Sequence, residues 1–532
     1  MKSPLLLILS LFVAGNACAQ TSQVPLYTDL GTHTMPITTT SRQAQQYFDQ
    51  GLRLTYGFNH PEAIRAFTRA TQLDPSCAMC WWGLAYAHGP HVNAGMDSAG
   101  GVQAYAAIQK ARAASGRATA RERAYIRALG ARYAAVPPAD RAKLDSAYAT
   151  AMAQVALTHP TDLDAATLHA ESLMDLRPWN YWMADGAPYP GTTNIVRQLE
   201  RVIALNPQHP GACHYYIHAV EAVKPELALP CAERLAKLMP GAGHMVHMPA
   251  HIYIRVGRWN DAVTANEHAI HTDETFIEGQ KPEGPYPMSY YPHNIHFLAF
   301  VSTMAGRSAQ AIEAAKNLAA KVNPDAARQY DALQEFVVYH PLTLATFGKW
   351  DEVLAAPLAP RDMPFAVAMG NYARGVAFAA KGQLPQAQAA LDSLNALAAA
   401  TPETGYWKNT LTVATHSLMG EIAHRKGDHS AAITHLREAV KAEDASLYFE
   451  PPLWYHPVRH SLGAVLLAAG QNAEAEKVYR ESLKKFPENG WALYGLAAAL
   501  KAQGKTADAV EVEKRFATAW SGADVKLTAS RF

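Results

Sequence analysis

One pattern of small residues recurs along the chain and sets what it can fold into. Residues 44–75 carry Gly51, Ala63 and Ala70 before a closing Pro75, in two amphipathic stretches around a turn. The copies farther along the chain are Ala250/Gly257/Ala262/Ala269, Ala299/Gly306/Ala311, Gly375/Gly382/Ala387, Gly420/Gly427/Ala432/Ala439, Gly463/Gly470/Ala475/Pro487 and, 34 residues later, Ala497/Gly504/Ala509. Small residues let two helices approach closely, and a glycine between them ends the first helix. Because one such hairpin cannot bury its apolar face alone, we predict a stack of helical hairpins with a shared core.

This pattern resembles the tetratricopeptide repeat (TPR) family over residues 44–520. The resemblance implies an all-α fold, a TPR-like α-solenoid in which helical hairpins form a right-handed superhelix with a concave groove. The spacing breaks where Pro and Gly cluster, and we predict inserted loops there, near residues 88–125, 176–192, 275–292 and 355–366.

The first residues have the pattern of an export signal. Lys2 precedes an apolar run over residues 4–15, and Ala17, Cys18 and Ala19 supply small residues at a cleavage site. We therefore expect an exported protein, periplasmic or secreted. Lipidation of Cys18 is the alternative, although Gly15 stands where a large aliphatic residue is expected. The apolar run is too short to cross a bilayer, and no other stretch is long and uncharged enough, so no membrane span is predicted.

The resulting division of the chain has five parts. They are a signal peptide (1–19), an N-terminal extended segment (20–43), an N-terminal TPR-like solenoid with a histidine-rich groove (44–300), C-terminal TPR repeats (301–520) and a tail (521–532). Without the signal peptide, 46 basic residues balance 46 acidic ones, because Lys2 is lost from the 47 of the full chain. This balance argues against nucleic acid as a partner, since nucleic acid attracts a basic excess.

Export would place four further cysteines in an oxidising compartment, where disulfides persist. Four cysteines allow three pairings. The simplest is local, with Cys77 joined to Cys80 and Cys213 to Cys231. A redox role for the Cys77–Cys80 pair is the alternative, but no strand precedes it as a thioredoxin-like unit would require.

Histidines are concentrated in one part of the repeat array. Residues 209–296 hold 10 of the 23 histidines, whereas an even spread over 532 residues would place about four there. The resemblance implies that positions 2, 5 and 9 of each first helix face the groove. In successive repeats these positions hold His214 and His218, then His244, His247 and His251, then His293 and His296.

Histidines four residues apart on a helix can offer two imidazoles to one metal ion. If adjacent helices bring the pairs His214/His218 and His247/His251 together, four nitrogens could hold copper, iron or zinc. Glu221, one turn after His218, is a candidate ligand or general base. Met245 and Met248 favour copper. The alternative is a set of hydrogen-bonded histidines that bind a peptide or small ligand without metal.

Pro249 affects this prediction, because proline disrupts a helix interior. If a helix begins at Pro249, His244 and His247 lie outside it, and helical spacing no longer places them beside His251. His456 and His460 share the four-residue spacing, but neighbouring repeats have no matching histidines, so a capping or core role is predicted for them. His88 and His91 flank a Gly-Pro turn and are predicted to be loop residues. The aromatic tract around Trp179 and Trp182 is either a wall of the groove or a loop pinned to the core.

No sequence motif identifies a reaction. The chain lacks a Gly-x-Ser-x-Gly elbow, a phosphate-binding loop and an HExxH helix. The sequence therefore supports a TPR-repeat protein that binds a protein, peptide or small molecule in its groove, with a histidine-rich centre in residues 210–300. The alternatives are a metal-dependent enzyme using the same histidines and an assembly scaffold of the cell envelope.

Overall fold

The computed structural model describes residues 24–183 and 185–532, so the predicted signal peptide and Cys18 lie outside it. The described residues are helices joined by loops, with no strand among them beyond two isolated bridges, His91–Ala94 and Trp182–Pro188. The all-α fold class predicted from the repeats is confirmed. None of the described helices is both long and apolar enough to span a membrane.

The chain divides into two compact units that interleave in sequence. Of the described residues, unit 1 comprises those up to Ile252 together with His268–Tyr291, and unit 2 comprises Tyr253–Glu267 and Pro292–Phe532. Three helices contribute residues to both units: α12 (Pro249–Arg255), α13 (Trp259–Gln280) and α14 (Tyr291–Met304).

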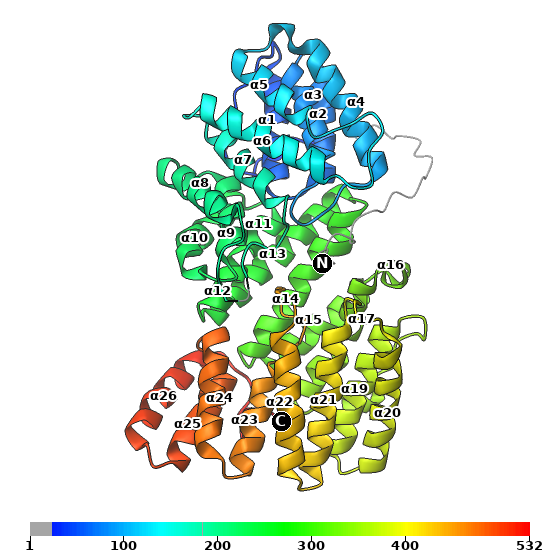
Figure 1. The fold of residues 1–532 in the computed structure, drawn as a ribbon, viewed down its shortest axis with the longest axis vertical. Helices are drawn as coiled ribbons and strands as arrows, with labels where there is room; N and C mark the ends of the chain where they lie inside the picture. Colours follow the sequence, from blue (N-terminus) through cyan, green and yellow to red (C-terminus); the bar gives the residue numbers. More distant parts are fainter. Residues whose placement is uncertain (1–23, 184) are drawn as a thin grey trace. The chain divides into compact units, whose positions relative to one another are not determined.

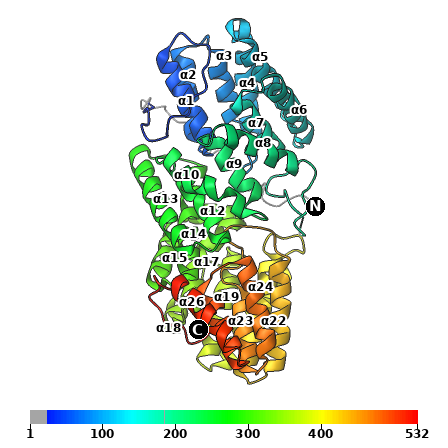
Figure 2. The same cartoon turned by 90° about the vertical axis from the view of Figure 1, so that its left-hand side faces the viewer.

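Unit 1 is a succession of paired helices (Figures 1 and 2). Residues 24–41 have no helix, and the helices that follow are α1 (Arg42–Tyr56), α2 (His60–Leu73), α3 (Ala78–Ala87), α4 (Ser98–Ala114), α5 (Ala120–Leu129), α6 (Ala142–Thr158), α7 (Leu163–Met174), α8 (Thr192–Leu205), α9 (Pro210–Val220), α10 (Leu229–Leu238) and α11 (Gly243–His247). Helix α9 packs against α7, α8 and α1, so residues distant in sequence meet around it.

Close contact between α1 and α9 depends on one glycine. A Cβ atom at Gly211 would lie 2.5 Å from Cδ1 of Tyr56, so only a residue without a side chain lets the tyrosine ring lie there. Tyr56 is the last residue of α1, and the ring is fully buried. This contact places the end of α1 beside the start of α9.

Unit 2 is the more regular array. Its helices after α14 are α15 (Ser308–Lys321), α16 (Pro324–Gln329), α17 (Gln334–Thr346), α18 (Trp350–Ala355), α19 (Pro364–Ala380), α20 (Leu384–Ala400), α21 (Lys408–Arg425), α22 (His429–Asp444), α23 (Val458–Ala468), α24 (Asn472–Lys485), α25 (Gly490–Ala502) and α26 (Thr506–Ala519). Hairpins α19/α20, α21/α22, α23/α24 and α25/α26 pack internally, and each hairpin also packs on the next (Figure 1). This is the stacking that the repeat period predicts.

The glycines predicted to end first helices do so. Gly257, Gly306, Gly382, Gly427, Gly470 and Gly504 each follow a helix by two residues and have positive φ angles of 72° to 82°. A side chain is disfavoured in this left-handed conformation, so glycine ends the helix at low cost.

The predicted interruptions are only partly loops. Residues 176–191 and 356–363 lie between helices, but the loop predicted at 275–292 includes the end of α13 and a π-helix (Tyr286–Tyr290). The loop predicted at 88–125 contains all of α4. That prediction gave too much weight to Gly100 and Gly101. The Asp97 carboxylate caps the N-terminus of α4, accepting from the Gly100 N–H at 2.6 Å, and the alanine-rich sequence beyond favours a helix.

Candidate metal centre

The predicted histidine pairs lie on short helices of unit 1. His214 and His218 stand one turn apart on α9, which begins with Pro210 after the cap residue His209. His244 and His247 lie on α11, and Pro249 begins the next helix, which carries His251. The break predicted at Pro249 is therefore present, although His244 and His247 lie on a short helix of their own rather than on a loop.

Three of these histidines meet at one point. Nε2 of His214 lies 3.1 Å from Nε2 of His218 and 3.1 Å from Nε2 of His244. All three side chains are buried, and each offers a ring nitrogen within 4.8 Å of the other two. Nitrogens bound to a common ion at about 2.0 to 2.1 Å are about 2.9 Å apart at a right angle and about 3.3 Å apart at the tetrahedral angle. The two separations measured from His214 fall in this range.

The partners of Nδ1 fix which ring nitrogens carry protons. Nδ1 of His214 lies 2.6 Å from the carbonyl oxygen of Tyr56, which can only accept, so this nitrogen donates. Nδ1 of His218 lies 3.4 Å from Oε1 of Glu221, which accepts in the same way. In neutral rings, both Nε2 atoms then carry lone pairs. These lone pairs face each other across 3.1 Å, and an electrophile between them would satisfy both.

Burial keeps these rings neutral. It lowers the pKa of His214, His218 and His244 well below the ordinary value of 6.5, and neighbouring histidines add to the effect. Neutral imidazole is the form that binds a metal ion. Nδ1 of His244 is buried and has no hydrogen-bond partner among the described residues.

Glu221 connects this trio to the second predicted pair. Its Oε2 accepts from Nδ1 of His251 at 3.0 Å, and Nε2 of His251 lies 2.9 Å from Nε2 of His247. The structure thus groups His244, rather than His247, with His214 and His218. Both oxygens of Glu221 face imidazole Nδ1 atoms, an arrangement that orients histidines in many metal sites.

Two aromatic residues in unfavourable backbone conformations lie against the trio. Phe58 has a φ of 58° and Trp179 a φ of 62°. The Phe58 ring lies 4.5 Å from that of His214 and 5.9 Å from that of His218, and Trp179 meets His218 edge-on at 4.8 Å. Such conformations cost about 1 to 2 kcal/mol per residue and concentrate at functional sites.

The tryptophan tract contacts the histidine trio and is also pinned to the core. Trp179 forms a wall of the histidine trio, whereas Trp182 pins the loop by donating from Nε1 to the carbonyl of Ala219 at 2.8 Å. The loop is therefore fixed to the end of α9, next to His218.

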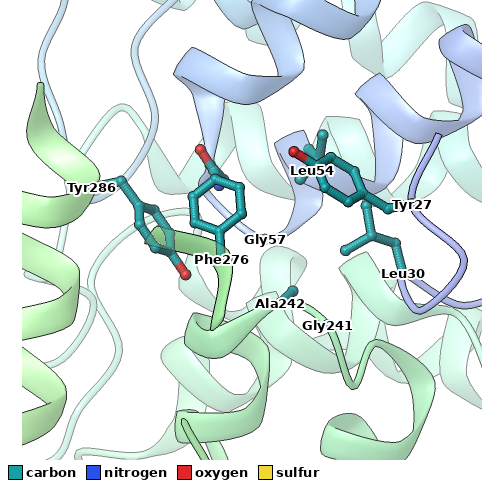
Figure 3. Close-up of a pocket in the computed structure, with 9 residues that line it drawn as sticks. Tyr27, Leu30, Leu54, Gly57, Gly241, Ala242, Phe276 and Tyr286 are labelled. Atoms are coloured by element: carbon teal, nitrogen blue, oxygen red, sulfur yellow. The ribbon is translucent and has the colours of Figure 1, made fainter. Parts of the chain in front are cut away.

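A cavity of about 10 Å³ lies near α11 (Figure 3). Its walls are formed by Tyr27, Leu30, Leu54, Gly57, Asn59, Gly241, Ala242, Phe276 and Tyr286. This is about the smallest volume that can hold one water molecule. The Tyr286 hydroxyl accepts from the His244 N–H at 3.3 Å and donates to Asp273 at 2.7 Å, so this wall holds the start of α11.

The remaining predicted ligands belong to unit 2. His293 and His296 lie on α14, where His293 meets the Phe297 ring edge-on at 5.7 Å. His296 is buried, with Nε2 3.6 Å from Oε1 of Glu335, and burial lowers its pKa to about 3. Met245 of unit 1 packs against Gly57, as a core residue does.

The cysteines lie in two local pairs. Cys77 and Cys80 form a disulfide at the start of α3. Cys213 and Cys231 are buried thiols in the structure, with their sulfurs 2.9 Å apart.

Sequence reasoning missed several residues that shape the centre. The Tyr56 carbonyl gives no side-chain signal, and Phe58 looks like an ordinary core residue. His91 was predicted to lie in a loop, which it does, yet it is buried and stacks on Phe58 at 4.6 Å. A bulky residue directly after Gly57, between two helices, is the one signal that could have pointed to Phe58.

Comparison with known proteins adds a family match over part of unit 2. A tetratricopeptide repeat family model matches residues 466–512, which supports the predicted TPR character. No curated protein matches the chain in sequence. Solved structures similar to the chain include the human IFIT1 dimer with m7Gppp-AAAA, at 12% identity, 91% coverage of each chain and a TM-score of 0.32. The APC/C hetero-tetramer Cut9-Hcn1 is similar at 12% identity, with 91% of this chain and 95% of that chain covered and a TM-score of 0.31. Likenesses at this level do not identify a function.

Proposed function

We propose that this TPR-repeat protein binds a transition-metal ion in unit 1 through Nε2 of His214, His218 and His244. The observation that carries the proposal is that Nε2 of His214 and Nε2 of His218 lie 3.1 Å apart in a buried site, while Nδ1 of each ring faces a hydrogen-bond acceptor. Without an ion, two lone pairs would face each other in a medium of low polarity, which is unfavourable. A bound cation converts this repulsion into two bonds.

The donor set suits copper, iron or zinc. Imidazole nitrogen is a ligand for all three metals, and it excludes calcium and magnesium, which prefer oxygen. The Nδ1–H groups of His214 and His218 point to a carbonyl and a carboxylate, the usual partners of metal-bound histidine.

Metal analysis of the purified protein tests the proposal. We expect one ion per chain at the trio, and its loss in the double variant His214→Ala/His244→Ala. The matched control is His456→Ala/His460→Ala, which removes another buried histidine pair and should keep the metal. Equal metal content in the trio variant and the wild type would contradict the proposal, as would a wild type that takes up no zinc, copper or iron.

A metal-dependent enzyme is the second candidate, because three protein ligands leave coordination positions for water or substrate. In this case Glu221 would orient His218 and His251 rather than act as a free base, since both of its oxygens contact imidazoles. Hydrolase and oxidase activity measured on the loaded protein, with the trio variant as control, separates catalysis from binding alone.

Partner or ligand binding in the groove remains part of the proposal. Unit 2 also contains a second cavity that can be tested for ligand binding. A cavity of about 60 Å³ is lined by Ser417, Glu421, Tyr455 and Arg531 among others. Glu421 and Arg531 form an ion pair, and the buried Ser417 hydroxyl has no hydrogen-bond partner among the described residues. Co-purification of a stoichiometric protein, lost in Ser417→Leu, would instead favour a cell-envelope scaffold.

We also propose export and a second disulfide, between Cys213 and Cys231. Export rests on residues 1–19 of the sequence, and the disulfide on two buried sulfurs 2.9 Å apart. Mass spectrometry of the secreted or periplasmic protein tests both. We expect an N-terminus at Gln20 and two disulfides, and free thiols at Cys213 and Cys231 would contradict the pairing.

A further inference from the structure

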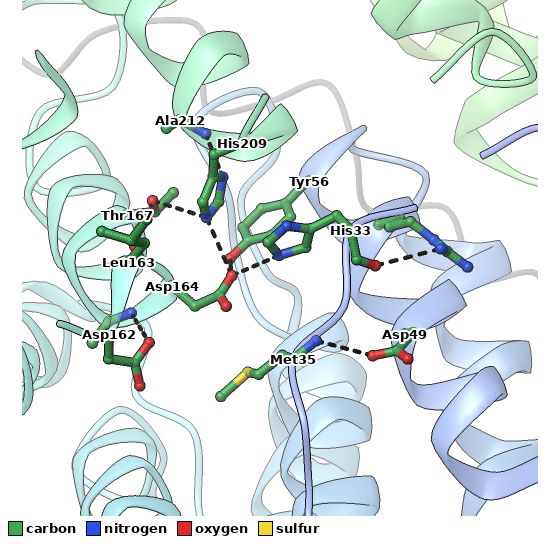
Figure 4. A network of polar contacts seen from close by, with 12 residues as sticks. His33, Met35, Asp49, Tyr56, Asp162, Leu163, Asp164, Thr167, His209 and Ala212 are labelled. Carbon is green, nitrogen blue, oxygen red and sulfur yellow. Dashed lines mark hydrogen bonds and ion pairs between the residues drawn. The ribbon is translucent and has the colours of Figure 1, made fainter. Parts of the chain in front are cut away.

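A second group of metal-binding residue types lies in unit 1, on the far side of Tyr56 from the trio. Oδ1 of Asp164, near the start of α7, lies 2.9 Å from Nε2 of His33 and 3.3 Å from Nε2 of His209 (Figure 4). The Tyr56 hydroxyl donates to the same oxygen at 2.7 Å. One carboxylate oxygen therefore contacts side chains from the N-terminal extended segment, the end of α1 and the start of α9.

The hydrogen bonds of His209 argue against a metal ion here. His209 caps α9, and its Nδ1 accepts the N–H of Ala212 at 3.1 Å. In the neutral ring the proton is then on Nε2, the atom that faces Asp164 and Thr167. This Nε2 has no lone pair for a metal, so the group is a set of donors around one anionic acceptor.

The charge of Asp164 is consistent with this arrangement. Burial acts to raise the pKa of the carboxyl group, but hydrogen bonds from His209 and His33 outweigh it and hold the pKa well below its ordinary value. Asp164 is thus a buried anion at neutral pH, held by strong, charge-assisted hydrogen bonds.

Two of the three residues that donate to Asp164 are also connected to His214. Tyr56 offers its hydroxyl to Asp164 and its main-chain carbonyl to Nδ1 of His214. His209 caps the helix on which His214 lies, five residues later. Both connections end at the ring whose Nε2 faces His218 and His244.

We propose that Asp164 is a positioning residue for the metal centre: by holding Tyr56 and His209, it fixes the place and tautomer of His214. This inference rests on the proposed function. Asp164, His209 and Tyr56 then support the metal-binding histidines without binding the ion themselves. His33, Asp164 and His209 do not form a second metal site. Partners of metal-bound histidines typically change affinity 10- to 100-fold when removed.

The test compares the full-length variant Asp164→Asn with Asp49→Asn, using zinc alone as the probe. Asp49 is a matched control because it is buried and accepts from the Met35 N–H at 3.1 Å, holding the same N-terminal segment without contacting Tyr56 or His209 (Figure 4). Competition with a chromophoric chelator should show zinc binding weakened by up to about 10-fold in Asp164→Asn, the lower end of the range for direct partners, because Asp164 acts through Tyr56 and His209. Asp49→Asn should keep the wild-type affinity. The milder variant Tyr56→Phe removes one of the three donors, so it should weaken zinc binding less and guards against misfolding of Asp164→Asn.

A measurement on the zinc-free protein separates positioning from a general loss of stability. In ¹⁵N NMR of the imidazoles, His214 of the wild type should be protonated at Nδ1, and Asp164→Asn should show a mixture of tautomers. Wild-type affinity and tautomer in folded Asp164→Asn would overturn the inference. The inference would also be overturned if Asp164→Asn lost a second zinc ion while its zinc affinity at the trio stayed unchanged. That result would show that His33, Asp164 and His209 form a metal site. A wild type that binds no zinc, copper or iron but shows the tautomer change in Asp164→Asn would overturn the metal function alone, leaving the effect of Asp164 on His214 intact.

Discussion

Each unit contains a buried histidine pair with the same four-residue spacing, and the two pairs are bonded differently. In unit 1, His214 and His218 face each other through Nε2, with Nδ1 of each ring on an acceptor. In unit 2, Nδ1 of His460 lies 3.2 Å from Nε2 of His456, and Nε2 of His460 lies 3.2 Å from the Ser482 hydroxyl. A hydroxyl can donate or accept, so a single proton between the two rings satisfies the unit 2 pair.

The difference shows that spacing alone does not define a metal site. Both pairs are buried, and burial lowers the pKa of the histidines in both. What distinguishes the two pairs is the hydrogen-bond partner of the ring nitrogen that faces away from the other histidine. A carbonyl or carboxylate at Nδ1 can only accept and so leaves Nε2 unprotonated, whereas a hydroxyl can donate or accept and so allows either tautomer. The unit 1 pair also has a third imidazole, His244, whereas no third metal-binding side chain among the described residues joins the unit 2 pair.

The largest expected difference between the two pairs follows from removing one histidine ring from each. His214→Ala should abolish metal binding at the trio, because two imidazoles remain where three are needed. His460→Ala should leave the metal content unchanged, although the cavity it creates lowers stability. Metal content and equilibrium dialysis against zinc check both variants. Metal lost equally from the two would show that the unit 2 pair is also a metal site.

A smaller change alters only the hydrogen-bond partner of the histidines and leaves the rings in place. In Glu221→Gln, the new amide N–H groups cannot accept, so either His218 or His251 must lose its hydrogen bond and change tautomer. We expect zinc affinity to fall by about 10- to 100-fold. The matched change in unit 2, Ser482→Ala, removes the hydroxyl partner of His460 and should not affect zinc affinity. Unchanged affinity in Glu221→Gln would show that the carboxylate does not orient the trio.

The acid sensitivity of unit 2 should follow from its neutral, buried histidines. Burial lowers the pKa of His456 to about 3 from the ordinary 6.5. Between these two values the unfolded chain holds one more proton than the folded chain, so the unfolding free energy falls by about 1.4 kcal/mol for each unit that the pH drops. Above pH 6.5 this loss is absent, and below pH 3 it is complete.

His456→Gln should remove this contribution and flatten the pH dependence by that amount. Hydrogen exchange of the α23 amides at a series of pH values, corrected for intrinsic rates, measures the slope. His429→Gln changes a partly exposed histidine of the same unit and is the control. Equal slopes in wild type and His456→Gln would contradict the expected cost of protonation.

The sequence predicted the parts of this molecule that repeat and not the parts that connect distant segments. The period of small residues located the helix ends at Gly427 and Gly470, because a helix end is a local property of the chain. The four-residue histidine spacing likewise placed His214 and His218 on one face. By contrast, the Tyr56 carbonyl reaches His214 across 158 residues of sequence, and every residue type has a carbonyl. Nothing in the spacing of the histidines indicates that His244, rather than His247, lies beside His214.

Glycines allow the mildest test, because they have different functions in the two units. At Gly427 the φ angle is 82° and a Cβ atom would have no neighbour within 4 Å, so Gly427→Ala should cost only the backbone penalty, about 1 kcal/mol, with metal binding unchanged. At Gly211 the backbone is helical, and the Cβ of alanine would instead press on the Tyr56 ring at 2.5 Å. Moving Tyr56 would shift the carbonyl that holds His214, so Gly211→Ala should weaken zinc binding as well as stability. Urea unfolding and zinc titration of both variants check this contrast. Zinc affinity equal to wild type in folded Gly211→Ala would show that His214 keeps its position without Tyr56.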